Sequence, residues 1–306
     1  MKIIYTSDLH VDPNHLDRLF AAGEHFQAHA VFIGGDLIPV GAWTLSASIK
    51  AQKRWLEDIF LPRLNIFNGK FPNTSFFFDF GNDDLMANRS LLANKAGRYL
   101  NLIHMQVVDI DPNLSLVGYM TVPPTPFKLK DWEKLDSPNQ EGIDENTRIK
   151  GAKTETGAER PHKLKLSDGT IEDDLAKLTE LLEKPPWQER AFLFISHGPP
   201  ADTKLDVLPD GRHVGSIAIR RFIEYWGKNG RLQASFHGHI HESPWMSGEV
   251  FDRIEGVPCF NVGQQAGQLR SLYFDSKDLE NSMKLVIVNE DRKPYKISIH
   301  ELSIRL

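Results

Sequence analysis

Short apolar runs rich in aromatic and β-branched residues recur along the chain, and each predicts a buried strand. The clearest occupy residues 3–5, 30–33, 76–78, 191–195 and 234–236. Amphipathic segments between them predict helices at about 12–26, 47–67, 171–183 and 214–226, and another that ends near residue 99. Strands that alternate with helices in this way indicate an α/β fold.

Three other regions differ from this alternation. Two of them contain short predicted strands without helices between them: the first at 107–110 and 114–119, and the second at 257–262, 272–274, 285–288 and 297–304. Between residues 122 and 170 the pattern breaks, because apolar residues are few and Pro, Lys, Glu, Asn and Thr are frequent. A stretch of this length without a period is typical of a lid, a binding loop or a partly disordered insertion.

Composition narrows the function classes. The chain of 306 residues is 41% hydrophobic and 25% charged with a formal net charge of −5, which argues against a polyanion-binding surface as its main function. Its single cysteine, Cys259, excludes an intramolecular disulfide and fits a reducing compartment. Met1 leads directly into the first predicted strand and no apolar run reaches membrane-spanning length, so we expect a soluble cytoplasmic protein.

Polar residues that can bind metal follow five of the apolar runs. Ligands in open α/β sheets collect beyond the carboxyl ends of the strands, so we expect these side chains at one rim. A D-x-H pair alone is a weak signal in a chain with 12 His and 41 acidic residues; its weight comes from the later runs. In chain order the residues are Asp8 and His10, Asp36, Asn82, His197, and His239 and His241.

The donor types point to the kind of metal. Carboxylate or amide oxygens together with imidazoles suit a borderline divalent ion such as Mn, Fe, Ni or Zn. Seven side chains are too many for one ion and about right for two, if one carboxylate bridges them. Glycines next to most of these residues, among them Gly81 and Gly238, allow sharp turns and close approach.

The ordered pattern resembles the signature of the calcineurin-like metallophosphoesterases. That signature is D-x-H, G-D, G-N-H-[DE], a His after an apolar strand, and G-H-x-H. It is represented here by Asp8-Leu9-His10, Gly35-Asp36, Gly81-Asn82-Asp83-Asp84, His197 and Gly238-His239-Ile240-His241. The resemblance spans about residues 1–262 and does not include the 122–170 stretch or the C-terminal strands. The His-Gly-Pro-Pro sequence at His197 also resembles one branch of the superfamily.

The resemblance implies a four-layer α-β-β-α sandwich with mixed sheets and a dinuclear centre. It places Asp8, His10 and His241 on one metal ion and Asn82, His197 and His239 on the other, with Asp36 as the bridge. It also implies hydrolysis by in-line attack of a metal-bridging hydroxide, with Asp36, Asn82 and Asp83 at the catalytic centre.

One position departs from the family pattern. The His that the family uses as an acid toward the leaving group is Asp83 here. An Asp with its ordinary pKa near ~3.9 is a poor proton donor at neutral pH. Neighbouring metals should keep Asp83 ionised, whereas the adjacent Asp84 should raise its pKa. Since lost acid catalysis slows poor leaving groups most, we hypothesise a phosphodiesterase with reduced dependence on a general acid.

Other polar residues carry weaker hypotheses. Arg212 and His213, on the loop after His197, and Arg89 are candidate phosphate contacts, although surface turns explain them equally well. His237 is either a residue that orients a ligand or a core residue. Four cations of the 122–170 stretch are candidates for contacts from a lid, although a solvated loop explains them better: Lys128, Lys130, Lys134 and Arg148.

The combined prediction is a single domain over residues 1–306 that acts as a metal-dependent phosphohydrolase on a small-molecule phosphoester, with diesters preferred to monoesters. Two alternatives stay open. One is a scaffold of the same fold that has lost catalysis, against which the intact ligand set argues. The other is a nuclease, against which the acidic net charge argues weakly. The sequence does not specify the oligomeric state.

Overall fold

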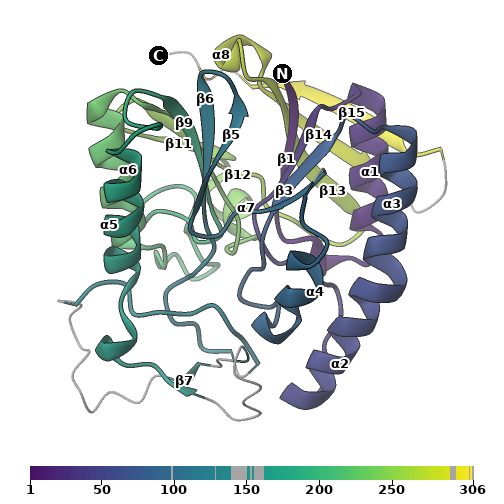
Figure 1. Cartoon of the computed structure of the whole chain (residues 1–306), viewed down its shortest axis with the longest axis horizontal. Helices are drawn as coiled ribbons and strands as arrows, with labels where there is room; N and C mark the ends of the chain where they lie inside the picture. The colour runs from purple at the N-terminus through teal and green to yellow at the C-terminus, as the bar shows by residue number, and fades with distance from the viewer. Residues whose placement is uncertain are drawn as a thin grey trace.

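Two mixed β-sheets packed face to face form the centre of the computed structural model (Figure 1). The structure describes residues 1–97, 99–127, 129–138, 150–151, 154, 162–289, 294–302 and 304. Aromatic side chains from both sheets meet between them: the ring centroids of Tyr5 and Phe236 are 5.0 Å apart, and those of Phe236 and Phe274 are 5.2 Å apart. Burial of these large rings supplies much of the apolar driving force for the sandwich.

The first sheet contains the strands that begin the chain and the strands that end it. Its order is β15-β14-β13-β1-β2-β3-β4, with β1 to β4 parallel and β13 to β15 antiparallel. The strands are β1 (Lys2–Thr6), β2 (Ala30–Ile33), β3 (Ser75–Phe78), β4 (Leu100–Leu102), β13 (Gln268–Asp275), β14 (Lys284–Asn289) and β15 (Lys296–Glu301). Because β13 pairs directly with β1, the C-terminal strands complete this sheet.

The second sheet has the order β11-β12-β10-β9-β6-β5. Its four central strands are parallel, and the two edge strands, β11 and β5, are antiparallel to their neighbours. The strands are β5 (Gln106–Asp111), β6 (Leu114–Tyr119), β9 (Ala191–Ser196), β10 (Leu232–His237), β11 (Phe251–Ile254) and β12 (Val257–Asn261).

Helices cover the outer face of each sheet (Figure 1). The first sheet is covered by α1 (His15–Phe26) and α3 (Leu61–Lys70). A π-helical turn (Leu56–Phe60) joins α3 to α2 (Leu45–Trp55), which packs against the loop after β3. The second sheet is covered by α5 (Ile171–Leu182) and α6 (Ile217–Asn229). The predicted four-layer α-β-β-α sandwich is therefore confirmed. No described helix is long and apolar enough to cross a membrane.

Several element boundaries differ from the sequence prediction. The helix expected to end near residue 99 is a 3-10 turn (Met86–Asn88) followed by the short α4 (Arg89–Ala93), and residues 100–102 form strand β4 beside β3. Helix α6 begins at Ile217, later than predicted, because the Ser216 side chain caps it by accepting a hydrogen bond from the Ile219 amide at 2.9 Å. The remaining short helices are α7 (Ser243–Ser247) and α8 (Leu279–Ser282).

The first part of the 122–170 stretch is held firmly to the sandwich. Asp131 donates its amide to the carbonyl oxygen of Asn82 at 2.8 Å, and its carboxylate accepts the amide of Met86 at 3.1 Å. The buried Lys130 and Glu133 form an ion pair of 2.8 Å. Lys134 pairs with Asp174 on α5, and the two other cations predicted there, Lys128 and Arg148, lie outside the described residues.

Candidate metal centre

The carboxyl ends of β1, β2, β3, β9 and β10 bring the seven predicted ligands together. Their side chains form a connected set of contacts, in which Asp36 and His197 are central. Both sheets contribute ligands to the centre. The first sheet supplies those that follow β1, β2 and β3, and the second sheet supplies those that follow β9 and β10. The connected residues are Asp8, His10, Asp36, Asn82, His197, His239 and His241.

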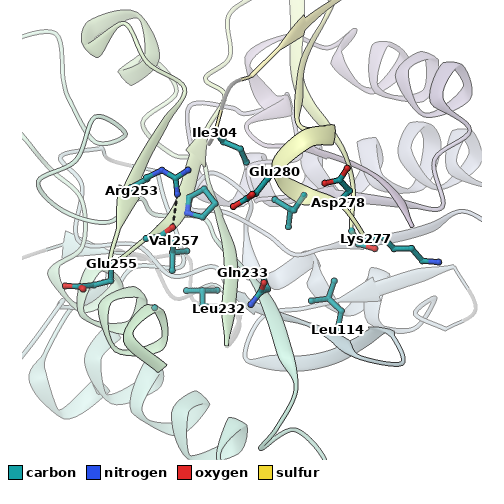
Figure 2. Close-up of a pocket in the computed structure, with 15 residues that line it drawn as sticks. Leu114, Leu232, Gln233, Arg253, Glu255, Val257, Lys277, Asp278, Glu280 and Ile304 are labelled. Atoms are coloured by element: carbon teal, nitrogen blue, oxygen red, sulfur yellow. Dashed lines mark hydrogen bonds between the residues drawn. The ribbon is translucent and has the colours of Figure 1, made fainter. Parts of the chain in front are cut away.

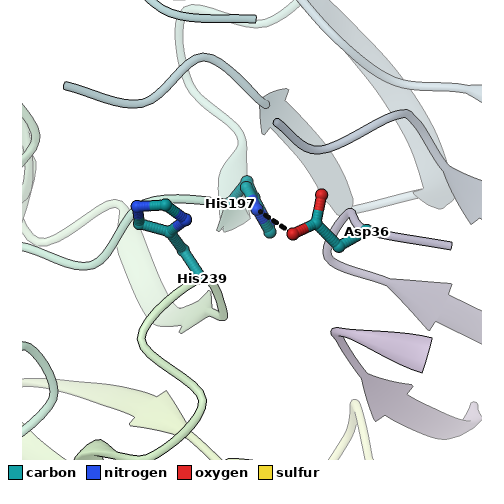
Figure 3. Close-up of side chains that lie close together, drawn as sticks. All are labelled: Asp36, His197 and His239. Atoms are coloured by element: carbon teal, nitrogen blue, oxygen red, sulfur yellow. Dashed lines mark ion pairs between the residues drawn. The ribbon is translucent and has the colours of Figure 1, made fainter. Parts of the chain in front are cut away.

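Two groups of side chains within this set have the geometry of metal sites. One contains Asp8, His10 and Asp36, and the other contains Asp36, His197 and His239, with one potential ligand atom from each residue within 4.8 Å of the others. Figure 3 shows the Asp36 carboxylate directed at His197, with the His239 ring nearby. Asp36 belongs to both groups, which is the arrangement a bridging carboxylate requires.

The group around His197 is pre-oriented by hydrogen bonds. The Nδ1 atom of His197 donates to the carbonyl oxygen of Gly34 at 2.7 Å, so Nε2 points toward the centre. That Nε2 lies 3.2 Å from Oδ2 of Asp36 and 3.0 Å from Oδ1 of Asn82. A backbone acceptor that fixes the ring in this way is a common support for metal-binding histidines.

The group around Asp8 contains buried polar atoms that lack hydrogen bonds. Oδ1 of Asp8 accepts the amide of His239 at 3.0 Å, but Oδ2 has no hydrogen-bond partner among the described residues. Nδ1 of His10 is also buried without one, and lies 3.6 Å from Oδ2 of Asp36. Buried polar atoms without partners are costly, and a divalent cation would satisfy both. The residues present therefore fit a metal.

Asn82 and His241 lie at the edge of the two groups. Asn82 is buried and donates from Nδ2 to Oδ1 of Asp83 at 3.1 Å. The His241 ring centroid lies 5.8 Å from that of His10, and its Nδ1 lies 3.6 Å from Oε2 of Glu242. His241 is the more exposed of the two, so its imidazole faces the open side of the centre.

The backbone at the centre is strained and tightly packed. Asp8, Asp36 and His239 all have positive φ angles, of 56°, 50° and 67°. This conformation costs non-glycine residues about 1–3 kcal/mol each and is concentrated at functional sites. A Cβ on Gly238 would lie 1.8 Å from Oγ of Ser7, and one on Gly81 would lie 2.2 Å from Oδ1 of Asp36. The glycines next to the predicted ligands are therefore required by close approach.

The pKa values at the centre are set by burial and by the charges of neighbouring groups. Burial would lower the pKa of His197, but the Asp36 carboxylate outweighs it and raises that pKa to about 9. Burial opposes ionisation of Asp36, but His197 holds the pKa of Asp36 well below its usual value. Burial and the charge of His197 lower the pKa of His239 to about 3, so its imidazole is neutral, the form that binds metal.

Asp83 and Asp84 have different surroundings, although they are adjacent in sequence. Burial and the charge of Asp36 raise the pKa of Asp83 to about 6, and its Oδ2 lies 3.7 Å from Nε2 of His10. The Asp84 carboxylate instead accepts the backbone amides of Leu37, Ile38 and Gly81. Asp36, rather than Asp84, is thus the main carboxylate that raises the pKa of Asp83.

The three candidate phosphate contacts lie in other surroundings. Arg89 binds Asp79 through two hydrogen bonds of 2.7 Å. Arg212 pairs with Asp210 at 2.7 Å on an exposed turn. His213 donates to the buried Asp206, at 2.8 Å. None of the three lines a cavity that contains the predicted metal ligands.

His237 is part of the core between the strands. Its ring nitrogens lie 2.8 Å from Oγ of Ser196 and 2.8 Å from Oγ of Ser235, and its backbone oxygen accepts the Tyr5 hydroxyl. Burial lowers the pKa of His237 to about 3. Of the two interpretations that the sequence left open, the structure supports the core residue.

Two cavities open beside the centre and share His10 and Asp83. The proline cavity, of about 350 Å³, is walled by Pro123, Pro124, Pro126 and Phe127. The Leu129 cavity, of about 270 Å³, is walled by residues 38–42, Leu85 and Leu129. Sequence reasoning missed both walls, although the proline cluster directly after β6 was a usable signal for a rigid loop.

A third cavity, of about 510 Å³, lies at the opposite end of the strands (Figure 2). Its lining includes Leu114, Leu232 and Val257, which begin β6, β10 and β12, whereas the metal centre follows the strand ends. Arg253 donates to the Gly256 carbonyl oxygen at 2.8 Å, and no candidate metal group of the described residues lies there. The candidate metal ligands therefore lie at the carboxyl ends of the strands, away from this cavity.

Solved structures with the same fold as this chain are known. No family model and no curated protein sequence matches the chain. Two solved chains match over 99% of both lengths at 14% identity, one with a TM-score of 0.59 and the other, TT1561 of Thermus thermophilus, with 0.51. A protein named as a 5'-nucleotidase from Staphylococcus aureus matches with a TM-score of 0.50 at 13% identity, and the match covers 55% of that chain. The chain thus shares the fold of these solved chains, and it carries candidate Asp and His metal ligands at the strand ends.

Proposed function

We propose that this protein is a dinuclear metal-dependent phosphohydrolase that prefers phosphodiesters. The observation that carries the proposal is the double role of Asp36, which belongs to both candidate metal groups. One group would hold its ion through Asp8, His10, Asp36 and His241, and the other through Asp36, Asn82, His197 and His239. Mn, Fe, Ni or Zn suits these donors.

Divalent ions at these positions would supply positive charge for the phosphoryl oxygens and a water of lowered pKa for in-line attack. The chain's own residues hold the geometry. The Gly34 carbonyl orients His197, and the His239 amide orients Asp8. The Asp83 amide donates to Oδ1 of Asp36 at 2.8 Å, which leaves Oδ2 directed toward His197 and His10.

The charges beside the centre favour a diester. A monoester carries a second negative charge at neutral pH, which phosphatases commonly balance with an arginine or a lysine. Among the described residues that line the two cavities there is neither, and the charged groups are Asp36, Asp83 and Glu242 besides the histidines. A monoanionic diester is therefore the better match. The same acidic lining opposes a polyanionic nucleic acid.

Asp83 takes the place of the acid that faces the leaving group. Its pKa of about 6 in the metal-free protein would leave a minor protonated fraction at neutral pH, and bound cations would reduce it further. We propose that Asp83 contributes little as an acid. With Asp83→Asn, rates on diesters with poor leaving groups should stay within about threefold of wild type. A loss of ~100-fold or more on those substrates, with p-nitrophenyl esters unaffected, would instead assign it an acid role.

The decisive experiment is hydrolysis of bis(p-nitrophenyl) phosphate and p-nitrophenyl phosphate by metal-stripped protein titrated with Mn²⁺. We expect metal-dependent turnover, a preference for the diester, and two bound ions per chain by calorimetry. Asp36→Asn should abolish turnover and weaken both metal sites, whereas Asp58→Asn, at an exposed position on the π-helical turn, serves as the matched control.

Three outcomes would contradict the proposal in different ways. Binding of two ions without turnover of either ester would favour the scaffold interpretation. Binding of a single ion would contradict the bridging role of Asp36. Tight, salt-dependent binding of DNA with strand cleavage would favour the nuclease interpretation.

A further inference from the structure

The two cavities at the centre are arranged as a pair. The proline cavity and the Leu129 cavity both include His10 and Asp83, so they extend from a common point beside the candidate metal ligands. A phosphodiester has the same topology, because one phosphorus atom carries two organic groups. We propose that the substrate is a diester with two uncharged, largely apolar groups, one held in each cavity. This inference rests on the proposed function.

Apart from Ser48, Gln52 and the shared His10 and Asp83, the walls of the Leu129 cavity are apolar, and its loop is fixed in position. Ile38, Val40 and Leu129 contribute side chains to it. Its loop is held because the Ala42 amide donates to Oγ of Ser48 at 2.9 Å, and because the Ile38 amide donates to Asp84. An apolar surface that is held open at a reactive centre is suited to an apolar substituent.

The proline cavity is fixed in a different way. Its prolines restrict their own backbone, and Glu133 accepts both the amide and the hydroxyl of Thr125, at 2.9 Å and 2.7 Å. Lys130 is buried, donates to the Thr125 carbonyl and pairs with Glu133. Two buried charges thus hold a loop whose contribution to the cavity is apolar apart from Thr125. Pre-organisation of this kind lowers the entropic cost of binding.

Large apolar side chains are also exposed at the openings. Phe127 is 59% exposed and Leu129 is 36% exposed. Trp43, which directly follows the Ala42 of the Leu129 cavity, is fully exposed. Phe127 and Leu129 belong to the linings of the two cavities, so their exposed faces extend the apolar walls toward solvent. They would cover the outer part of both ester groups.

The test uses two diesters with the same leaving group. Bis(p-nitrophenyl) phosphate and methyl p-nitrophenyl phosphate both release p-nitrophenolate and differ only in the group that stays on phosphorus. The ratio of their kcat/KM values, compared between wild type and variant, cancels their intrinsic reactivity. We expect this ratio to be about tenfold higher in Mn²⁺-loaded wild type than in the variant of the cavity that holds the retained group, since apolar burial drives that change.

Variants in each cavity should then separate the two roles. Leu129→Ser and Phe127→Ser are matched by Leu166→Ser and Ile66→Ser, which remove equally exposed side chains, 39% and 65% exposed, away from the centre. One cavity variant should lower the diaryl preference about tenfold, to the ratio set by intrinsic reactivity, because its cavity holds the retained group. The other should lower kcat/KM for both diesters by a similar factor, because its cavity holds the leaving group. The controls should change neither.

A direct binding measurement supports the kinetics. Diphenyl phosphate should bind the Mn²⁺-loaded protein about tenfold more tightly than dimethyl phosphate by calorimetry, and both cavity variants should weaken only diphenyl phosphate. The inference alone is overturned if both diesters are hydrolysed without a preference that the cavity variants change. An oligonucleotide as the better substrate would overturn the proposed function as well. Absence of any metal-dependent turnover would instead overturn the proposed function beneath it.

Discussion

Asp84 gives a sharp test of how the metal centre is held together. Its carboxylate is fully buried and accepts the amides of Leu37 and Ile38 at 2.9 Å each and of Gly81 at 3.0 Å. Leu37 and Ile38 directly follow Asp36, and Gly81 directly precedes Asn82. One side chain therefore joins the two loops that carry a ligand from β2 and a ligand from β3.

The cost of Asp84→Ala follows from these three bonds. An amide left buried without a partner costs about 1–3 kcal/mol, and three of them give an upper range of ~3–9 kcal/mol. Water entering the vacated space would recover part of this, so we expect a loss of about 3–5 kcal/mol in the free energy of unfolding. Asp84→Asn keeps one acceptor oxygen but turns an NH₂ group toward a donor, and should cost about half as much.

The measurement is urea unfolding of the metal-free protein at pH 8, above the pKa of about 7 to which burial and the Asp36 charge raise Asp84. Asp58→Ala, at an exposed position, is the control. Calorimetry with Mn²⁺ on the folded variants should show affinity weakened about tenfold or more, because the two ligand loops are no longer tied. An Asp84→Ala protein with a stability loss below about 1 kcal/mol and unchanged metal affinity would refute this reasoning.

Four further predictions concern the same region. Gly238→Ala should abolish binding of at least one metal, because the new Cβ would lie 1.8 Å from Oγ of Ser7. Gly69→Ala places its Cβ near no other atom and should bind metal normally. Equal metal binding by both variants would contradict the packing argument. His197 has its pKa raised to about 9, so it must release a proton when it binds metal. The metal affinity measured by calorimetry should therefore rise between pH 7 and pH 9, with about one proton released. A pH-independent affinity would exclude His197 as a ligand. The same raised pKa stabilises the metal-free fold below pH ~6.5, and this stability should decline as the pH rises through about 9. Asp131→Ala removes the anchor of the loop behind the proline cavity and should raise KM for the diester several-fold with two metals still bound; an unchanged KM would show that the loop has no part in binding.

The ligand positions could be read from the sequence because strand ends are local features. An apolar run such as 191–195 followed by a polar residue specifies where a strand stops and which side chain comes next. Parallel strands all present their carboxyl ends at one rim, so Asp36, Asn82 and His197 were predicted to meet without any knowledge of the order of the strands. The alternation of strands and helices likewise predicted the α/β class.

Other features depended on contacts between distant segments. Nothing local in residues 268–275 indicates that β13 lies beside β1, because that pairing is determined by how the sheets close over a common core. Asp83 and Asp84 are adjacent in sequence but have different surroundings. Asp84 accepts backbone amides of another loop, whereas Asp83 lies beside His10. The sequence thus determined which groups reach the centre, while tertiary packing decided their charge states and the shape of the cavities, since both depend on neighbours far away in the chain.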